Sequence, residues 1–174
     1  MSDETAIVEE PPARSLPDIP VLHTLFEQFE AVEWESSLGQ DVARVPNEAW
    51  LEFATAAKDS GFEVCVDVTA VDWMRDRPDR FEIVANLLSM SEKVRLRMTT
   101  TTGRAEPSVA SLVPVWPGAN FAEREAYDMF GIIFEGHPDL TRILMPDEWE
   151  GHPLRKDFGV GSVPVQFKES HQVT

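Results

Sequence analysis

The sequence predicts an α+β or α/β fold in which helices flank a mixed β-sheet and a long extended C-terminal arm follows. Apolar and polar residues alternate over three segments between residues 64 and 98, which is the period of strands. Helical spacing precedes and follows these segments, and no period persists after residue 135. The expected organisation is a disordered acidic arm (1–17), an α/β core domain (18–134) and an extended interaction arm (135–174).

Two helices and a hairpin are predicted ahead of the sheet. Apolar residues at helical spacing indicate a helix from Pro20, and the segment 33–45 around Leu38 and Gly39 is typical of a hairpin. A second helix follows Pro46 and ends at Gly61. Its expected inner face consists of Trp50, Leu51, Ala54 and Ala57.

Strands are predicted at 64–70, 81–87 and 94–98, with Val64 and Val66 on the same face of the first strand as Val68. A short helix is expected at 109–113. Another is expected at 121–130, ending at Gly131. For that second helix the spacing predicts an Asn120–Glu123 capping box and an exposed Arg124–Asp128 ion pair.

Composition excludes several classes of protein. The 174 residues include 15 basic and 31 acidic side chains and carry a net charge of −16, so nucleic acid and anionic lipid are repelled. A single cysteine, Cys65, cannot form an internal disulfide or build a thiolate metal site alone. No apolar run long enough to span a bilayer occurs, and the first ten residues lack a secretory or presequence pattern, which favours a bacterial or archaeal cytoplasmic protein or a trimmed mature form.

The segment 121–158 is rich in acids and histidines and raises the alternative of a metal-dependent hydrolase. Its candidate ligands and acid/base groups would be Glu123, Glu125, Asp128, His137, Asp139, His152 and Asp157. The spacing argues against this interpretation, because the two histidines lie 15 residues apart and each precedes a proline. No nucleophile elbow or phosphate-binding loop is present either.

An interaction surface is the favoured interpretation of the same segment. Aliphatic and aromatic residues are spread over chain without a period of its own, so they need a surface to lie on, and we expect the arm to order on a partner. These residues are Ile143, Leu144, Met145, Trp149, Leu154, Phe158 and Phe167. A basic cluster (Arg75, Arg77, Arg80, Lys93, Arg95 and Arg97) has two open interpretations, a solvated strand face or a contact with an acidic partner.

The run from Glu123 to Phe158, which includes EREAYDMFGI, GHPDLTRIL and PDEWEGHPLRKDF, resembles the 30-kDa subunit family (the C subunit in bacteria) of respiratory complex I, the proton-pumping NADH:quinone oxidoreductase. The resemblance covers roughly residues 20–160, and the sequence departs from it at Gly159, where members of the family commonly have proline. It implies a peripheral, non-catalytic subunit on the cytoplasmic side of the membrane that docks on the 49-kDa subunit (the D subunit in bacteria). It also implies that this chain holds no cofactor or metal, and that FMN, iron–sulfur clusters and quinone belong to partner subunits.

The resemblance also implies which residues bind the partner. They are Glu123, Arg124, Glu125, Tyr127, Asp128, Phe130, His137, Pro138, Leu140, Arg142, Ile143, Leu144, Trp149, His152, Leu154, Arg155, Lys156, Asp157 and Phe158. The same module is expected in related ferredoxin- or deazaflavin-driven oxidoreductases and in membrane-bound hydrogenases, which remain an alternative.

Overall fold

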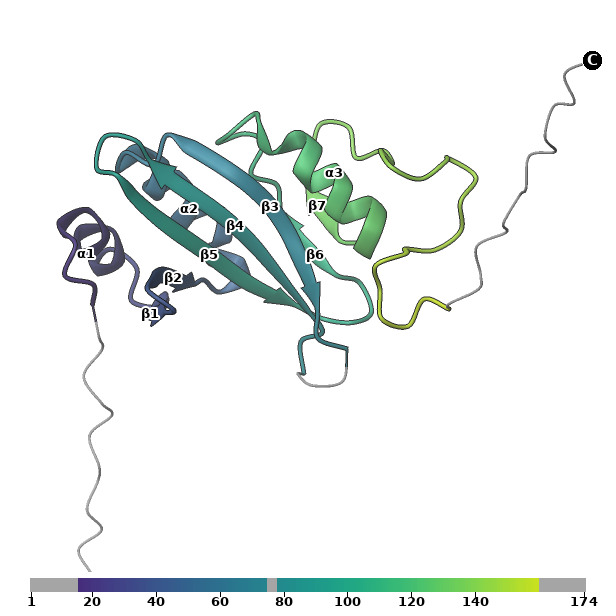
Figure 1. The fold of residues 1–174 in the computed structure, drawn as a ribbon, viewed down its shortest axis with the longest axis horizontal. Coiled ribbons are helices and arrows are strands. Elements are labelled where there is room, and N and C mark those ends of the chain that lie inside the picture. The colour runs from purple at the N-terminus through teal and green to yellow at the C-terminus, as the bar shows by residue number, and fades with distance from the viewer. Residues whose placement is uncertain (1–15, 75–77, 160–174) are drawn as a thin grey trace, which may run out of the picture.

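A computed structural model describes residues 16–74 and 78–159. Most of the predicted acidic arm and residues 160–174 of the predicted interaction arm lie outside these residues, as do Arg75, Arg77 and Phe167. The described chain places one mixed sheet, its helices and the first part of the C-terminal arm (Figure 1).

Five strands form the sheet, in the order β1-β2-β5-β4-β3. Their bounds are β1 Glu33–Ser37, β2 Gln40–Arg44, β3 Val64–Asp72, β4 Phe81–Ser89 and β5 Val94–Thr102. β2 and β5 pair in parallel, whereas the other neighbouring strands pair antiparallel. The predicted mixed sheet is therefore confirmed, and β1 and β2 form the predicted hairpin.

Two helices pack against one face of the sheet and leave the other open. α1 (Pro20–Glu27) and α2 (Trp50–Asp59, preceded by the short helix η1, Asn47–Ala49) meet through the rings of Phe26 and Phe53, whose centroids are 5.7 Å apart. Figure 1 shows α2 behind the sheet, with no helix over β4 and β5 on the near side. Phe53 is buried on the inner face of α2, where Leu51 was predicted; Leu51 is exposed.

The start of β3 differs from its predicted alternation. A bulge between Cys65 and Asp67 shifts the register against β4, so that Val64 and Val66 are exposed while Val68 is buried. An extra residue in one strand turns the preceding side chains to the opposite face. The bulge therefore adds two valines to the exposed surface of the sheet edge.

The region after the sheet contains two short strands, the first of which lies where a short helix was predicted at 109–113. β6 (Ser108–Ala110) pairs in parallel with β7 (Ile133–Glu135), and the Ser111 N–H donates to the Glu135 carbonyl at 2.8 Å. This pairing joins residues 25 apart and overrides the local helical pattern of 109–113. Between the two strands, α3 (Ala119–Phe130) packs beside the edge strand β3 (Figure 1).

Candidate interaction surface

Residues 136–159, here called the arm, contain no helix or strand, as the sequence predicts. Figure 1 shows the arm passing α3 and returning toward the sheet. The Leu154 N–H donates to the Met129 carbonyl at 3.1 Å, which ties the arm to the end of α3. Several anchors therefore join the described part of the arm to the core of its own chain, which the sequence did not predict, while its ordering on a partner stays a prediction.

The first anchor is the carboxylate of Asp128 in α3, which is fully buried. Its Oδ2 accepts hydrogen bonds from three consecutive backbone N–H groups, those of residues 143–145, at 2.7–3.0 Å. Its Oδ1 accepts from Arg142 Nη1 at 2.7 Å. Burial by itself raises the pKa of Asp128, but these donors outweigh it and hold the pKa below the usual range. The ionised carboxylate thus fixes the turn at 142–145.

The second anchor is Arg80, at the start of β4, whose side chain is 2% exposed. It donates to both carboxylate oxygens of Asp72, at 2.9 and 2.7 Å, and to both of Asp157, at 2.7 and 2.8 Å. The Lys156 N–H also donates to Asp72 at 2.8 Å. The guanidinium lowers the pKa of both carboxyl groups. One buried cation therefore joins the end of β3, the start of β4 and the end of the arm.

Aromatic contacts complete the packing of the arm. The guanidinium carbons of Arg80 and Arg155 lie 4.8 and 5.0 Å from the centroid of the Phe81 ring. The rings of Trp149 and Phe158 stack with centroids 6.3 Å apart. Such cation–π and stacking contacts add specific geometry to apolar burial.

Two glycines allow the arm to approach closely. Gly131 ends α3 with φ +73°, as predicted, and a Cβ there would lie 2.5 Å from Nε2 of His152. Gly151 has φ +87°, and a Cβ there would lie 2.8 Å from the Phe158 ring. Residues with a side chain rarely adopt these positive φ angles, so both positions need glycine for conformation and for space.

Glu123 joins α3 to the segment after β6 and does not cap the helix. Its side chain is fully buried, and it accepts hydrogen bonds from the Ser111 hydroxyl and the Leu112 N–H, each at 2.6 Å. Burial raises the pKa of Glu123 to about 7, against the opposing effect of these two donors. The predicted capping box with Asn120 is therefore wrong, and α3 starts without a side-chain cap.

The two histidines of the arm make hydrogen-bond contacts to backbone groups of the arm and of α3. His137 accepts from the Asp139 N–H through Nδ1, at 3.1 Å, and its Nε2 lies 3.3 Å from the Asn120 carbonyl. His152 Nδ1 lies 3.0 Å from the Asp128 carbonyl, and its ring meets Tyr127 edge-on. Within residues 16–74 and 78–159, no group of three or more His, Cys, Asp and Glu side chains could hold a metal ion. Burial also raises the pKa of Cys65 to about 12, which keeps this thiol protonated at neutral pH.

The predicted partner-binding residues fall into buried, partly buried and exposed groups. Glu123 and Asp128 have no exposed surface, so their assignment to partner contact is corrected: they stabilise the chain's own fold. Arg124 donates to the backbone of Thr141 and Arg142 and does not pair with Asp128, which contradicts the predicted surface ion pair. Leu144 (59% exposed), Leu154 (53%) and Ile143 (37%) present apolar surface to solvent. Among the others, Glu125, Pro138, Lys156 and Asp157 are exposed, whereas Tyr127, His137, Leu140, Arg142, Trp149, His152, Arg155 and Phe158 are partly buried and Phe130 is buried.

Sequence reasoning missed the structural roles of two residues: it assigned none to Asp72, and it placed Arg80 in the basic cluster, whereas Arg80 is buried and paired within the chain. Asp72 and Arg80 lie eight residues apart on either side of a turn, and both are buried with their charges paired. Their opposite charges at adjoining strand ends were an available signal, since Asp72 and Phe81 are paired neighbours in the sheet. The second half of the contact, Asp157, lies far along the sequence and gave no local signal.

The fold and this site define a class of protein: a small α+β domain whose C-terminal arm is clamped to its core by buried ion pairs and exposes apolar side chains. The chain belongs to the family described as respiratory-chain NADH dehydrogenase, 30 Kd subunit, whose family model matches residues 43–163. The resemblance noted from the sequence is thereby confirmed.

Proteins similar in sequence are named as the C subunit of NADH-quinone oxidoreductase. One from Saccharopolyspora erythraea is 50% identical over 107 residues, covering 62% of this chain and 43% of its own length. One from Mycolicibacterium smegmatis is 40% identical over 136 residues, covering 78% of this chain and 57% of its own length. The chain therefore spans about half the length of these relatives.

Two solved structures are similar in fold. A trypsin-resistant fragment (1–134) of Nqo5 is 31% identical and superposes with a TM-score of 0.64 over 69% of this chain and 99% of the fragment. A chain of the membrane-bound sulfane sulfur reductase, an archaeal respiratory membrane complex, has a TM-score of 0.73 at 23% identity, over 89% of this chain and 97% of that one. In the described part of the chain, no helix is both long and apolar enough to cross a membrane.

Proposed function

We propose that this chain is a non-catalytic subunit of the hydrophilic arm of an NADH–quinone oxidoreductase, where it docks on the 49-kDa subunit. Family membership supports the complex, and the names of its relatives support the reaction. In this proposal FMN, iron–sulfur clusters and quinone belong to partner subunits, which carry electrons from NADH to quinone coupled to proton translocation. The chain sits at the cytoplasmic side of the membrane and reaches the membrane only through the complex.

The observation that carries the docking proposal is the exposed apolar surface of a clamped arm. Ile143 and Leu144 lie in the turn that Asp128 fixes. Leu154 donates its backbone N–H to the Met129 carbonyl, three residues before Asp157 pairs with Arg80. Exposed aliphatic side chains on an ordered backbone lose little conformational entropy on binding, so their burial contributes efficiently to affinity. The arm thus needs little rearrangement to dock.

The test replaces two exposed apolar residues of the arm and leaves its anchors intact. In cells that assemble the complex, the double variant Leu144→Asp/Leu154→Asp should reduce co-purification of the 49-kDa subunit by about ten-fold or more, because each substitution forces a charge into an apolar interface. The measurement is the ratio of the two subunits recovered through a tag on this chain. Trp149 and Phe158 are poorer targets, because they stack on each other within the arm.

The matched control is Leu38→Asn, which changes a fully exposed leucine in the turn between β1 and β2. Its φ of 52° is compatible with asparagine, so the variant should fold and co-purify normally. Undiminished recovery of the 49-kDa subunit with the double variant would contradict docking through the arm.

A related respiratory complex with another electron donor is the second candidate. Its support is the fold shared with a chain of the sulfane sulfur reductase, which at 23% identity concerns the fold alone. The discriminating measurement is the reduction of quinone by the purified native complex with NADH, reduced ferredoxin or reduced deazaflavin. Activity with NADH is the expected result, and activity with one of the other donors alone would favour the second candidate.

A further inference from the structure

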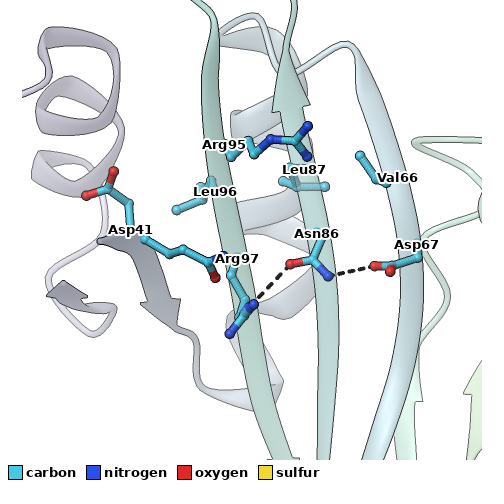
Figure 2. A pocket seen from close by; sticks show the side chains of 9 residues that line it. Asp41, Val66, Asp67, Asn86, Leu87, Arg95, Leu96 and Arg97 are labelled. Atoms are coloured by element: carbon cyan, nitrogen blue, oxygen red, sulfur yellow. Dashed lines mark hydrogen bonds between the residues drawn. The ribbon is translucent and has the colours of Figure 1, made fainter. Parts of the chain in front are cut away.

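The open face of the sheet carries two arginines side by side on β5. Arg95 and Arg97 point to the same side as Asn86 of β4, and they border a hollow of about 250 Å³ (Figure 2). A second hollow of about 580 Å³ adjoins it at Arg95 and extends to Met90 and Lys93. The face is thus grooved along β5 and is not covered by a described helix (Figure 1).

Neither arginine has an acidic partner among residues 16–74 and 78–159. Arg97 Nε donates to Asn86 Oδ1 at 3.3 Å, and Asn86 Nδ2 donates to Asp67 Oδ1 at 2.7 Å, so an amide separates the guanidinium from the carboxylate. Asp41 also borders the hollow, but it accepts from Trp34 Nε1 at 2.9 Å and points away from both arginines in Figure 2. No described carboxylate forms an ion pair with Arg95 or Arg97.

Arg44, on the same face of the neighbouring strand β2, provides a contrast. It forms ion pairs with Glu35 and Glu82. In a chain with 31 acidic and 15 basic residues, internal partners for cations are abundant. Arg95 and Arg97 form no ion pair with a described carboxylate, so their guanidinium groups remain strong, directional donors for a ligand.

The spacing of these donors indicates the shape of the ligand. Residues two apart on a strand point to the same side about 7 Å apart, and carboxylates at alternate positions of an extended segment have the same repeat. Glu35, Asp67 and Glu82 lie on the same face and would repel a polyanion that carries a charge on every unit. A segment with carboxylates at only two alternate positions carries less negative charge and is repelled less by these acids.

We propose that the open face of β3–β5 binds an extended acidic segment of a protein partner, whose two carboxylates at alternate positions pair with Arg95 and Arg97. The neighbouring hollow at Met90 receives the adjoining apolar residue of that segment. This surface lies on the sheet and not on the arm, so the inference goes beyond the proposed function and stands without it. It selects one of the two interpretations that the sequence left open for the basic cluster.

The test titrates the full chain with a synthetic peptide of alternating Glu and Thr in about 20 mM salt, where surface charges are weakly screened. Backbone amide shifts report the site, and calorimetry reports the Kd. Binding should shift amides of β4 and β5 near Asn86 and Arg97, and Arg95→Gln/Arg97→Gln should weaken it about ten-fold or more. Arg95→Lys/Arg97→Lys should recover part of the loss, because the charge remains and the bidentate geometry does not.

Arg44→Gln is the matched control, since it removes one positive charge from the same face; it should change the Kd less than about two-fold. Unchanged melting temperatures will show that each variant folds. Absence of binding by the unmodified chain, equal weakening by Arg44→Gln, or equal binding of a peptide with Gln in place of Glu would overturn the inference. Tighter binding of a thymidine oligonucleotide to the same amides would also overturn it, in favour of a nucleic-acid ligand.

Discussion

Glu123 is a carboxyl group buried where α3 meets the segment after β6. Its two donors, Ser111 and the Leu112 N–H, are neutral, and burial raises its pKa to about 7. The folded pKa lies above the ordinary value of about 4.3, so the folded state favours the protonated form. The resulting stability is complete below about pH 4 and is lost as the pH rises through about 7.

Glu123→Gln should therefore stabilise the protein at alkaline pH. The amide keeps an acceptor for the Leu112 N–H and never ionises. We expect its free energy of unfolding to exceed that of the natural chain by about 1–3 kcal/mol at pH 8 and by much less at pH 5. Urea unfolding at the two pH values measures both differences.

Asp128→Asn is the control on the same helix, because its ionised form is the stabilised one. It should lose stability at both pH values, by about 2 kcal/mol or more, since the amide cannot serve the donors that surround Asp128 equally well. If Glu123→Gln were less stable than the natural chain at pH 8, the inference that burial raises the pKa of Glu123 would be wrong.

The sequence predicts the existence of α3 but not the roles of its acids. Glu123 lies three residues after Asn120, so a capping box was its simplest interpretation. Asp128 lies four residues after Arg124, so a surface ion pair was its simplest interpretation. One signal pointed inward: Glu123 precedes the buried residues Ala126 and Phe130 by three and seven positions and lies on their stripe. The burial of Asp128 depends on the arm folding over it, which no local pattern encodes.

At the scale of elements, the connection between the β3–β4 pair and the arm depends on Arg80. Asp72 and Arg80 are buried in the sheet, whereas the Asp157 side chain is 50% exposed. Removing Arg80 leaves Asp72 as an unpaired buried charge, but removing Asp157 leaves a guanidinium that is still paired with Asp72. The two halves of this contact therefore have different energetic weights.

Arg80→Met should destabilise the whole domain by about 3–5 kcal/mol, because it leaves the Asp72 carboxylate buried without a cation. Asp157→Asn should change the global free energy of unfolding by less than about 1 kcal/mol, since its side chain is half-exposed. It should nevertheless release the end of the arm and speed proteolytic cleavage within 144–158 several-fold. Urea unfolding and limited proteolysis measure the two effects.

Asp139→Asn serves as the control, because Asp139 is an exposed carboxylate of the arm without an ion pair among the described residues. Its cleavage rate should match that of the natural chain. A natural cleavage rate for Asp157→Asn would show that Arg80 does not hold the arm.

Helices and strands with a regular pattern of apolar residues were predictable from the sequence, whereas the other elements depend on contacts between residues far apart in the chain. α1, α2 and the β1–β2 hairpin follow their sequence patterns. β6 and β7 were missed because each has three residues and finds its partner across α3. Prolines and glycines correctly predicted a segment without secondary structure, but its attachment to residues 72 and 80 required the tertiary structure.

At the scale of the whole molecule, a net charge of −16 and a pI near 4.5 imply self-repulsion that grows as the pH rises above 5. Glu123 acts in the same direction, because its ionisation in the folded state is unfavourable. Asp72, Asp128 and Asp157 act oppositely: their lowered pKa values give stability that is present above about pH 4 and lost as the pH falls below it.

These opposing effects predict a stability maximum in mildly acidic solution, at about pH 5, with a fall on both sides. Salt separates the contributions on the alkaline side. In about 1 M salt the screening length is about 3 Å, so surface self-repulsion is largely removed while the buried Glu123 is little affected. Melting temperatures between pH 3 and 8 should therefore fall less steeply above pH 5 in high salt, and Glu123→Gln should flatten most of the remaining slope. In high salt, a melting temperature that rose continuously from pH 5 to 8 would contradict the assigned direction of the Glu123 pKa. On the acid side, a melting temperature that began to fall well above pH 4 would contradict the lowered pKa values of Asp72, Asp128 and Asp157.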